Sequence, residues 1–173
     1  MFSDTLFQNL SGSLRNSTKV NYDAQSIPWE KVIDFATDQG VLAVAFDAFE
    51  KTSAQFRPNM ENMMEWMGQT SIVEQVNRDY ARAISDLSDL YQSLGLRMLV
   101  LKGYGCALNY PIPSHRPCGD IDIFLRDENG NHSDSLVKRF EQMLESRFGI
   151  QTSYHNTHHS RFLFEGFCVA DYQ

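Results

Sequence analysis

The chain has 173 residues, with 22 acidic against 15 basic side chains and a net charge of −7. This excess of negative charge is the wrong sign for gripping a nucleic-acid backbone, so we expect a small-molecule or nucleotide substrate and no nucleic-acid partner. Three cysteines stand far apart without a C-x-x-C pair, which argues against a disulfide framework and favours the reducing cytoplasm. The sequence shows no signal-peptide pattern and no membrane-spanning apolar run, so we expect no membrane partner.

The first half of the chain is predicted to be helical. Apolar residues recur there at three- and four-residue spacing, which is typical of helices with one buried face. The methionines between residues 60 and 67 follow this spacing, and we interpret them as core residues. Gly95 is predicted to cap the last helix. We therefore predict a helical region over residues 1–95. The segments that show the helical period are residues 29–36, 41–49 and 59–94.

After Gly95 the period changes to that of strands. The fold class is therefore predicted to be α+β, with a small mixed sheet and helices packed on one face over residues 96–173. Because the sequence ends at Gln173 in a strand pattern, we expect this core to be truncated and the chain to be a piece of a longer protein. The predicted strands are 97–101, 119–125, 150–154, 160–164 and 167–172, and the predicted helices are 104–109 and 133–148.

Two carboxylates stand one residue apart on a predicted strand. Alternation along the strand places Asp120 and Asp122 on one face, and Ile121 and Ile123 on the other. Two neighbouring carboxylates repel each other and resist burial, and a divalent cation is the usual remedy. Hard oxygen ligands at this spacing suit Mg²⁺ or Mn²⁺, which in turn suit phosphate chemistry. These residues therefore predict a metal site.

Three short motifs lead up to and include these acids. They are Leu101-Lys102-Gly103, then Tyr110-Pro111, then Arg116-Pro117-Cys118-Gly119-Asp120-Ile121-Asp122. On these motifs the chain resembles the nucleotidyltransferase superfamily, which has the fold of polymerase β, and within it a poorly characterised bacterial branch. The detailed likeness covers residues 96–125. The resemblance implies the nucleotidyltransferase fold, a short mixed sheet with helices on one face.

The resemblance also implies an activity and a set of catalytic residues. Members transfer a nucleoside monophosphate from a nucleoside triphosphate such as ATP to an acceptor, here a small molecule, and release pyrophosphate. Two Mg²⁺ or Mn²⁺ ions sit on the paired acids. The pattern implies Asp171 as a third carboxylate, with Glu165 as the fallback at the same strand parity. Asp120, Asp122 and Asp171 are thus the implied catalytic and metal-binding residues.

The first turn departs from the family pattern. Better-known members have Gly-Gly or Gly-Ser there, whereas this chain has Lys102-Gly103-Tyr104-Gly105. Lys102 would bring positive charge to a phosphate, while Gly103 and Gly105 allow close backbone approach. Arg116 completes the implied nucleotide-binding set through a phosphate or carboxylate partner. Alternatively, Lys102 is a surface lysine at a strand end and Arg116 pairs with a surface acid.

Other functions stay open at this point. A non-catalytic domain that keeps the fold for binding or assembly is compatible with the unusual first turn. A glycosyltransferase with a D-x-D metal motif is disfavoured, because only one strand-and-helix unit precedes the motif. The cluster His155-x-x-His158-His159 lacks a cysteine or acid at ligand spacing, so we predict a solvated hairpin rather than a zinc site. The acceptor, the preferred base and the oligomeric state are left open by the sequence.

Overall fold

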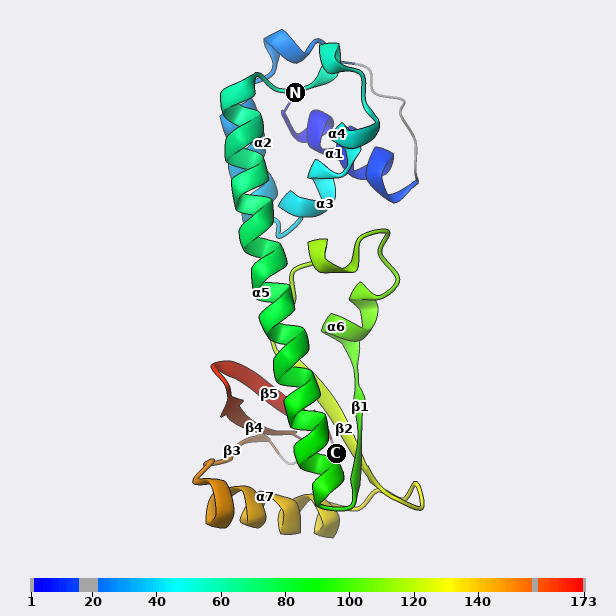
Figure 1. The fold of residues 1–173 in the computed structure, drawn as a ribbon, viewed down its shortest axis with the longest axis vertical. Helices are drawn as coiled ribbons and strands as arrows, with labels where there is room; N and C mark the ends of the chain where they lie inside the picture. Colours follow the sequence, from blue (N-terminus) through cyan, green and yellow to red (C-terminus); the bar gives the residue numbers. More distant parts are fainter. Residues whose placement is uncertain (1, 16–21, 157–158, 173) are drawn as a thin grey trace. The chain divides into compact units, whose positions relative to one another are not determined.

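The computed structural model describes residues 2–15, 22–156 and 159–172. The protein is α+β, with helices in the N-terminal part and a mixed sheet after them, as the sequence predicts (Figure 1). His158, in the middle of the histidine cluster, and Gln173 lie outside the described residues. Among the helices of the described ranges, none has both the length and the apolar character needed to cross a membrane.

The order of elements follows the predicted change from helices to strands, with boundaries shifted by one to three residues in most cases. The predicted helix over residues 41–49 is divided into two short helices, α3 and α4, on either side of Asp47. The helices are α1 (Phe2–Leu14), α2 (Trp29–Asp38), α3 (Leu42–Phe46), α4 (Ala48–Lys51), α5 (Met60–Ser93), α6 (Lys102–Ala107) and α7 (Asp134–Phe148), with short 3-10 turns at Ala24–Ser26, Ala54–Phe56 and Pro113–His115. The strands are β1 (Leu96–Val100), β2 (Ile121–Asp127), β3 (Ser153–Asn156), β4 (His159–Phe164) and β5 (Phe167–Tyr172).

The chain forms two compact units. The first consists of Met1–Asn77 and Ala107–Pro117, and the second of Arg78–Cys106 and Cys118–Gln173. The limits of these units therefore do not coincide with the change from helix to strand at Gly95. The reason is that the second half of α5 supplies core residues to the sheet, while the loop between α6 and β2 packs with the N-terminal helices.

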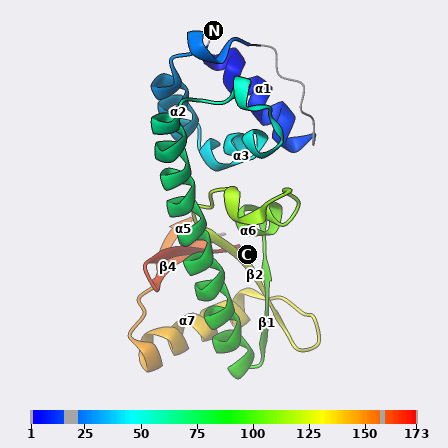
Figure 2. The same ribbon diagram turned by 45° about the horizontal axis from the view of Figure 1, so that its top comes forward.

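Within the first unit, α1, α2 and α3 lie beside the first part of α5 (Figure 2). The core of this unit is built around aromatic side chains carried by α2, α4 and α5. Trp29, Phe49 and Trp66 are buried, and their ring centroids lie 5.1 to 6.2 Å apart. Both indole N–H groups are satisfied, since Trp66 donates to the carbonyl of Leu42 and Trp29 to that of Ala24, each at 2.9 Å. Without these hydrogen bonds each indole would bury an N–H group that has no partner. The bonds therefore hold both rings in place.

The methionines of α5 do not form the core that the sequence suggests. Met60, Met64 and Met67 are 76, 61 and 53 % exposed, and only Met63 packs partly against the core. Residues at i, i+4 and i+7 share one face of a helix, and here that face differs from the one that buries Trp66. The interpretation of the methionine run as core is therefore wrong for these three residues.

The loop before β2 is held to the helices of the first unit by a buried histidine. His115 Nδ1 lies 2.5 Å from Asp47 Oδ1, and His115 Nε2 lies 2.9 Å from Glu74 Oε1. Asp47 also accepts a hydrogen bond from the Ser13 hydroxyl at 3.3 Å. Burial disfavours the charged imidazole, but the hydrogen bonds to Asp47 and Glu74 outweigh this effect and raise the pKa of His115. An imidazole with both nitrogens bonded to carboxylates is protonated.

We expect His115→Gln to destabilise the protein by about 3 kcal/mol, because Asp47 would keep its buried charge and lose its cationic partner. The pH dependence tests the charge itself. A raised histidine pKa means that the native state binds the extra proton, so this stability is complete below the unfolded pKa of about 6.5 and is lost as pH rises through the folded pKa. The free energy of unfolding, measured with urea, should change less between pH 6 and pH 9 in His115→Gln than in wild type. An equal change in the free energy of unfolding in both proteins would contradict the ion pairing.

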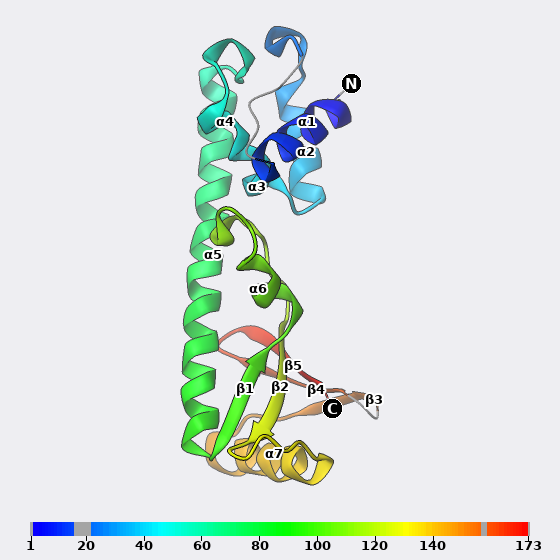
Figure 3. The same cartoon turned by 90° about the vertical axis from the view of Figure 1, so that its right-hand side faces the viewer.

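The second unit contains the sheet, with strand order β1-β2-β5-β4-β3. β2 pairs antiparallel with β1 and parallel with β5, and the remaining pairs are antiparallel. Within this unit β1 and β2 run along α5, and α7 crosses near the end of the sheet where β1 begins (Figures 1 and 3). Both helices contribute to a single core on one face of the sheet. The mixed sheet and the one-sided helix packing agree with the predicted fold class.

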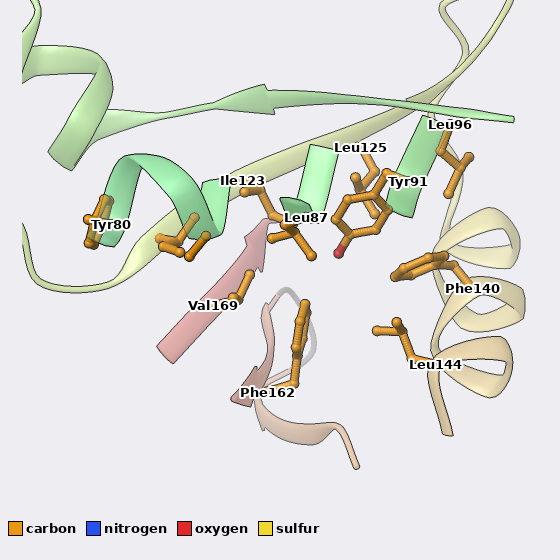
Figure 4. Close-up of a cluster of buried hydrophobic side chains, with 12 residues drawn as sticks. Tyr80, Leu87, Tyr91, Leu96, Ile123, Leu125, Phe140, Leu144, Phe162 and Val169 are labelled. Carbon is orange, nitrogen blue, oxygen red and sulfur yellow. The ribbon is translucent and has the colours of Figure 1, made fainter. Parts of the chain in front are cut away.

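The core of the second unit lies between α5, α7 and the sheet (Figure 4). Ile121, Ile123 and Leu125 of β2 have no exposed surface. They share the face that α5 and α7 cover, because alternate residues of a strand point to the same side. The remaining core residues shown are Tyr80, Leu87, Tyr91, Leu96, Phe140, Leu144, Phe162 and Val169.

Candidate active site

The face of the sheet opposite this core, which we call the open face, carries the paired acids. Cross-strand partners share a face, and the register therefore defines this face across four strands. Leu101 donates its N–H to the Asp122 carbonyl at 2.7 Å, which fixes the pairing of β1 with β2 at this point. By this register the open face includes Arg97, Leu99, Asp122, Phe124, Arg126, Arg161, Leu163, Cys168 and Ala170. Asp120, directly before β2, lies on the same side, because its carboxylate contacts Arg161.

The glycine-containing turn lies beside the start of β2. Lys102 has a φ of 39° and Gly103 has φ 7° and ψ −98°, so the chain bends sharply where β1 ends. A Cβ at Gly105 would lie 3.2 Å from the carbonyl oxygen of Val100, which is too close for most side chains. A Cβ at Gly103 would lie 3.5 Å from the carbonyl oxygen of Asp120. The turn and the first acid are therefore in van der Waals contact.

Tyr80 of α5 holds the backbone of the first acid. Its hydroxyl donates a hydrogen bond to the carbonyl oxygen of Asp120. The ring is buried, stacks on Tyr104 with centroids 5.9 Å apart, and meets the edge of Phe167 at 5.1 Å. Tyr80 falls inside the predicted helical segment 59–94, and no local pattern there indicates this role.

We expect Tyr80→Phe to lower the free energy of unfolding by about 1 kcal/mol, the usual contribution of one hydrogen bond. It should also weaken Mn²⁺ binding severalfold, because the Asp120 backbone loses its anchor. Tyr91→Phe is the matched control, since the buried Tyr91 hydroxyl has no hydrogen-bond partner among the residues described. Denaturant unfolding and Mn²⁺ titration of both variants make the comparison. Equal effects of the two substitutions would contradict an anchoring role.

Arg161 of β4 brings a positive charge to the first acid. Its Nη2 lies 3.6 Å from Asp120 Oδ2, and the two side chains are 43 and 42 % exposed. The neighbouring thiol of Cys168 is partly buried, and burial followed by the negative charge of Asp120 raises its pKa. Cys168 is therefore a neutral neighbour of the acids at neutral pH. No local pattern predicts Arg161 at this site, because only the register of β4 against β5 brings it to this face.

Asp171 faces the opposite way. The parallel register sets Asp171 beside Ile123 and Val169 beside Ile121, so Asp171 belongs to the core face and is only 2 % exposed. This geometry does not agree with a role as the third metal ligand beside Asp120. Asp171 lies on the same face of β5 as Val169, whereas Cys168 and Ala170 are the residues of β5 that lie on the open face beside the paired acids.

The buried Asp171 carboxyl lies in an apolar region near Tyr91 and Glu141. Its Oδ1 has no hydrogen-bond partner within the described ranges. Burial, and to a smaller extent the charge of Glu141, raise the pKa of Asp171 from 3.8 to about 7. Burial, followed by the charges of Asp171 and Glu141, raises the pKa of Tyr91. The carboxyl of Asp171 is thus suited to being protonated and is a poor metal ligand.

We expect Asp171→Asn to stabilise the protein above neutral pH. A raised carboxyl pKa means that the native state holds a proton that the unfolded state releases, so wild-type stability falls as pH rises from about 4 to about 7. Asparagine keeps the shape of the side chain without the charge. The free-energy difference between Asp171→Asn and wild type should therefore grow across this range by up to about 1.4 kcal/mol per pH unit. A difference independent of pH would contradict the raised pKa.

The remaining sequence-predicted residues fall in different places. Lys102 is exposed at the turn beside the acids. Glu165 lies in the turn between β4 and β5 with a φ of 49°, so strand parity does not apply to it. Arg116 belongs to the first unit, where its guanidinium lies 5.9 Å from the centroid of the Tyr110 ring and donates to the Pro117 carbonyl at 3.2 Å.

The open face suits a hard divalent cation through two ligands. No three acidic, histidine or cysteine side chains converge within the described ranges. Mg²⁺ is commonly held by one or two carboxylates, with water and substrate phosphates filling its other positions. The partly exposed carboxylates of Asp120 and Asp122 fit that pattern. Asp171 and Cys168 do not, because one faces the core and the other is a neutral thiol.

Comparison with protein families gives a match over most of the chain. A model of the family described as uncharacterised nucleotidyltransferase matches residues 25–169, which covers both the glycine turn and the paired acids. Searches of curated proteins and of solved structures gave no match.

Proposed function

The chain belongs to this family of uncharacterised nucleotidyltransferases, and we propose that it transfers a nucleoside monophosphate from a nucleoside triphosphate to a hydroxyl group of a small-molecule acceptor. The acceptor oxygen bonds to the α-phosphorus, the bond to the bridging oxygen breaks, pyrophosphate leaves, and the hydroxyl proton passes to water. The observation that supports this proposal is the placement of Asp120 and Asp122 on one accessible face, directly beside the glycine turn.

Each residue of the site has a role in this proposal. Asp120 and Asp122 hold Mg²⁺ or Mn²⁺, which when bound neutralises phosphate charge and lowers the pKa of the attacking hydroxyl. The backbone at Gly103 and Gly105 allows the triphosphate to approach closely, and Lys102 adds positive charge at that turn. Arg161 exchanges its contact with Asp120 for a phosphate oxygen, a partner that guanidinium binds well. Tyr80 keeps the Asp120 backbone in place.

A non-catalytic role is the second candidate, and a specific observation favours it. On β5, next to the paired acids, the open-face positions are Cys168 and Ala170 rather than a carboxylate. A protein of this kind would bind a metal-nucleotide complex and release no pyrophosphate. The two candidates therefore agree on binding and differ on turnover.

Mn²⁺ titration in the presence of ATP tests the binding step. We expect Asp122→Asn to weaken Mn²⁺ binding at least tenfold, because the cation loses one of its two protein ligands. Asp89→Asn, an exposed change of the same kind on α5, is the matched control and should stay within twofold of wild type. Equal affinities of Asp122→Asn and wild type would exclude the metal site.

Pyrophosphate release from ATP, measured with a low-molecular-weight cell extract as the source of acceptors, tests turnover. Release by wild type and not by Asp122→Asn would support the transferase. Binding without release would favour the non-catalytic module. A preference for UDP-glucose over ATP in the Mn²⁺ titration would favour the D-x-D glycosyltransferase instead.

A further inference from the structure

Two arginines lie directly opposite each other on the open face. Arg97 of β1 is the register partner of Arg126 of β2, and both side chains are exposed. Neither forms an ion pair with a carboxylate of the described residues. Like charges at directly opposed positions of an antiparallel pair are destabilising. Their juxtaposition creates a concentrated positive charge on a face that carries the paired acids farther along β2.

An apolar platform separates these arginines from the acids. Phe124 of β2 and its register partner Leu99 lie between them, and Leu99 is 44 % exposed. The Phe124 ring stacks on His132 with centroids 4.4 Å apart, and the Arg126 guanidinium lies 5.4 Å from its centroid. His132 Nδ1 is itself 2.7 Å from the carbonyl oxygen of Leu125, which holds the histidine ring in place. Phe124 is therefore held in place by two neighbouring side chains.

The strand sets the spacing of these groups. Asp122 and Arg126 are four residues apart on one strand, which corresponds to about 13 Å at the usual rise. Along this line the open face is acidic at Asp122, apolar at Phe124 and cationic at Arg126. A molecule lying along β2 with one reactive end at Asp122 would meet the guanidinium pair with its far end.

We propose that Arg97 and Arg126, with Phe124 and Leu99, form the binding site for the acceptor, and that the acceptor is an elongated molecule with an apolar middle and an anionic end. The assignment as acceptor rests on the proposed function, because it takes the reactive end to be the hydroxyl that meets the nucleotide at Asp122. Two arginines side by side bind the oxygens of a carboxylate or a phosphate. The apolar middle lies against the exposed Leu99 and the part of the Phe124 side chain that these contacts leave exposed.

The test uses aryl anions as probes and amide chemical shifts as the readout. Phenyl phosphate and 3-phenylpropionate should each shift the amide signals of residues 97–99 and 124–126, while uncharged benzyl alcohol should bind at least fivefold more weakly. The stronger of the two anions identifies the charged end as phosphate or carboxylate. Binding of benzyl alcohol as tight as that of both anions would overturn the proposal.

Two variants make the assignment to the arginines specific. Arg97→Gln/Arg126→Gln should raise the Kd of the better probe at least fivefold, whereas Arg139→Gln, an exposed change on α7, should leave it within twofold. An unchanged Kd in the double variant would overturn the proposal. Asp122→Asn separates the two proposals, because it should leave probe binding unchanged. If the arginines bind the probe but wild type releases no pyrophosphate, the proposed transfer fails and the anion site stands.

Discussion

The whole candidate site depends on the two-residue alternation of β2. Helices α5 and α7 cover one face of the sheet, so Ile121, Ile123 and Leu125 must point toward them. The same alternation places Asp122 on the open face, and Asp120, directly before β2, lies on that side beside Arg161. A slip of one residue would bury both carboxylates and expose three apolar side chains, which costs several kcal/mol. The packing of the core and the placement of the acids are therefore one constraint.

The sequence predicts well what is encoded locally. The helix after Ser133 begins where its hydroxyl accepts from the Leu136 N–H, and it ends where Gly149 adopts a left-handed φ of 67°. The strand that carries Asp120 and Asp122 is also recognisable from a short window. Register is a different matter, because it depends on which strands pair. The alternation of residues along one strand predicts that the paired acids share a face. It does not predict which face of the sheet Asp171 occupies, because that depends on how β5 pairs with β2.

Residues that join the site across the fold were missed for the same reason. Tyr80 comes from a helix forty positions before Asp120, and Arg161 comes from a strand that reaches β2 only through β5. The local sequence around Tyr80 does not differ from that around an ordinary core tyrosine. The sequence around Arg161 likewise resembles that around an ordinary surface arginine. The exposed face of Met60, Met64 and Met67 shows the same limit, because helical spacing alone does not say which of several apolar faces is buried.

The two long-range partners of Asp120 act on different parts of the residue. Tyr80 holds the backbone carbonyl from a buried position, which fixes where the carboxylate is attached. Arg161 meets the carboxylate at 3.6 Å in a half-exposed pair, and pairs of this kind contribute under about 1 kcal/mol. A cation that binds Asp120 can therefore displace the guanidinium at little cost. The freed guanidinium is then available to an anion beside the same cation, so occupation of the acids and binding of a phosphate favour each other.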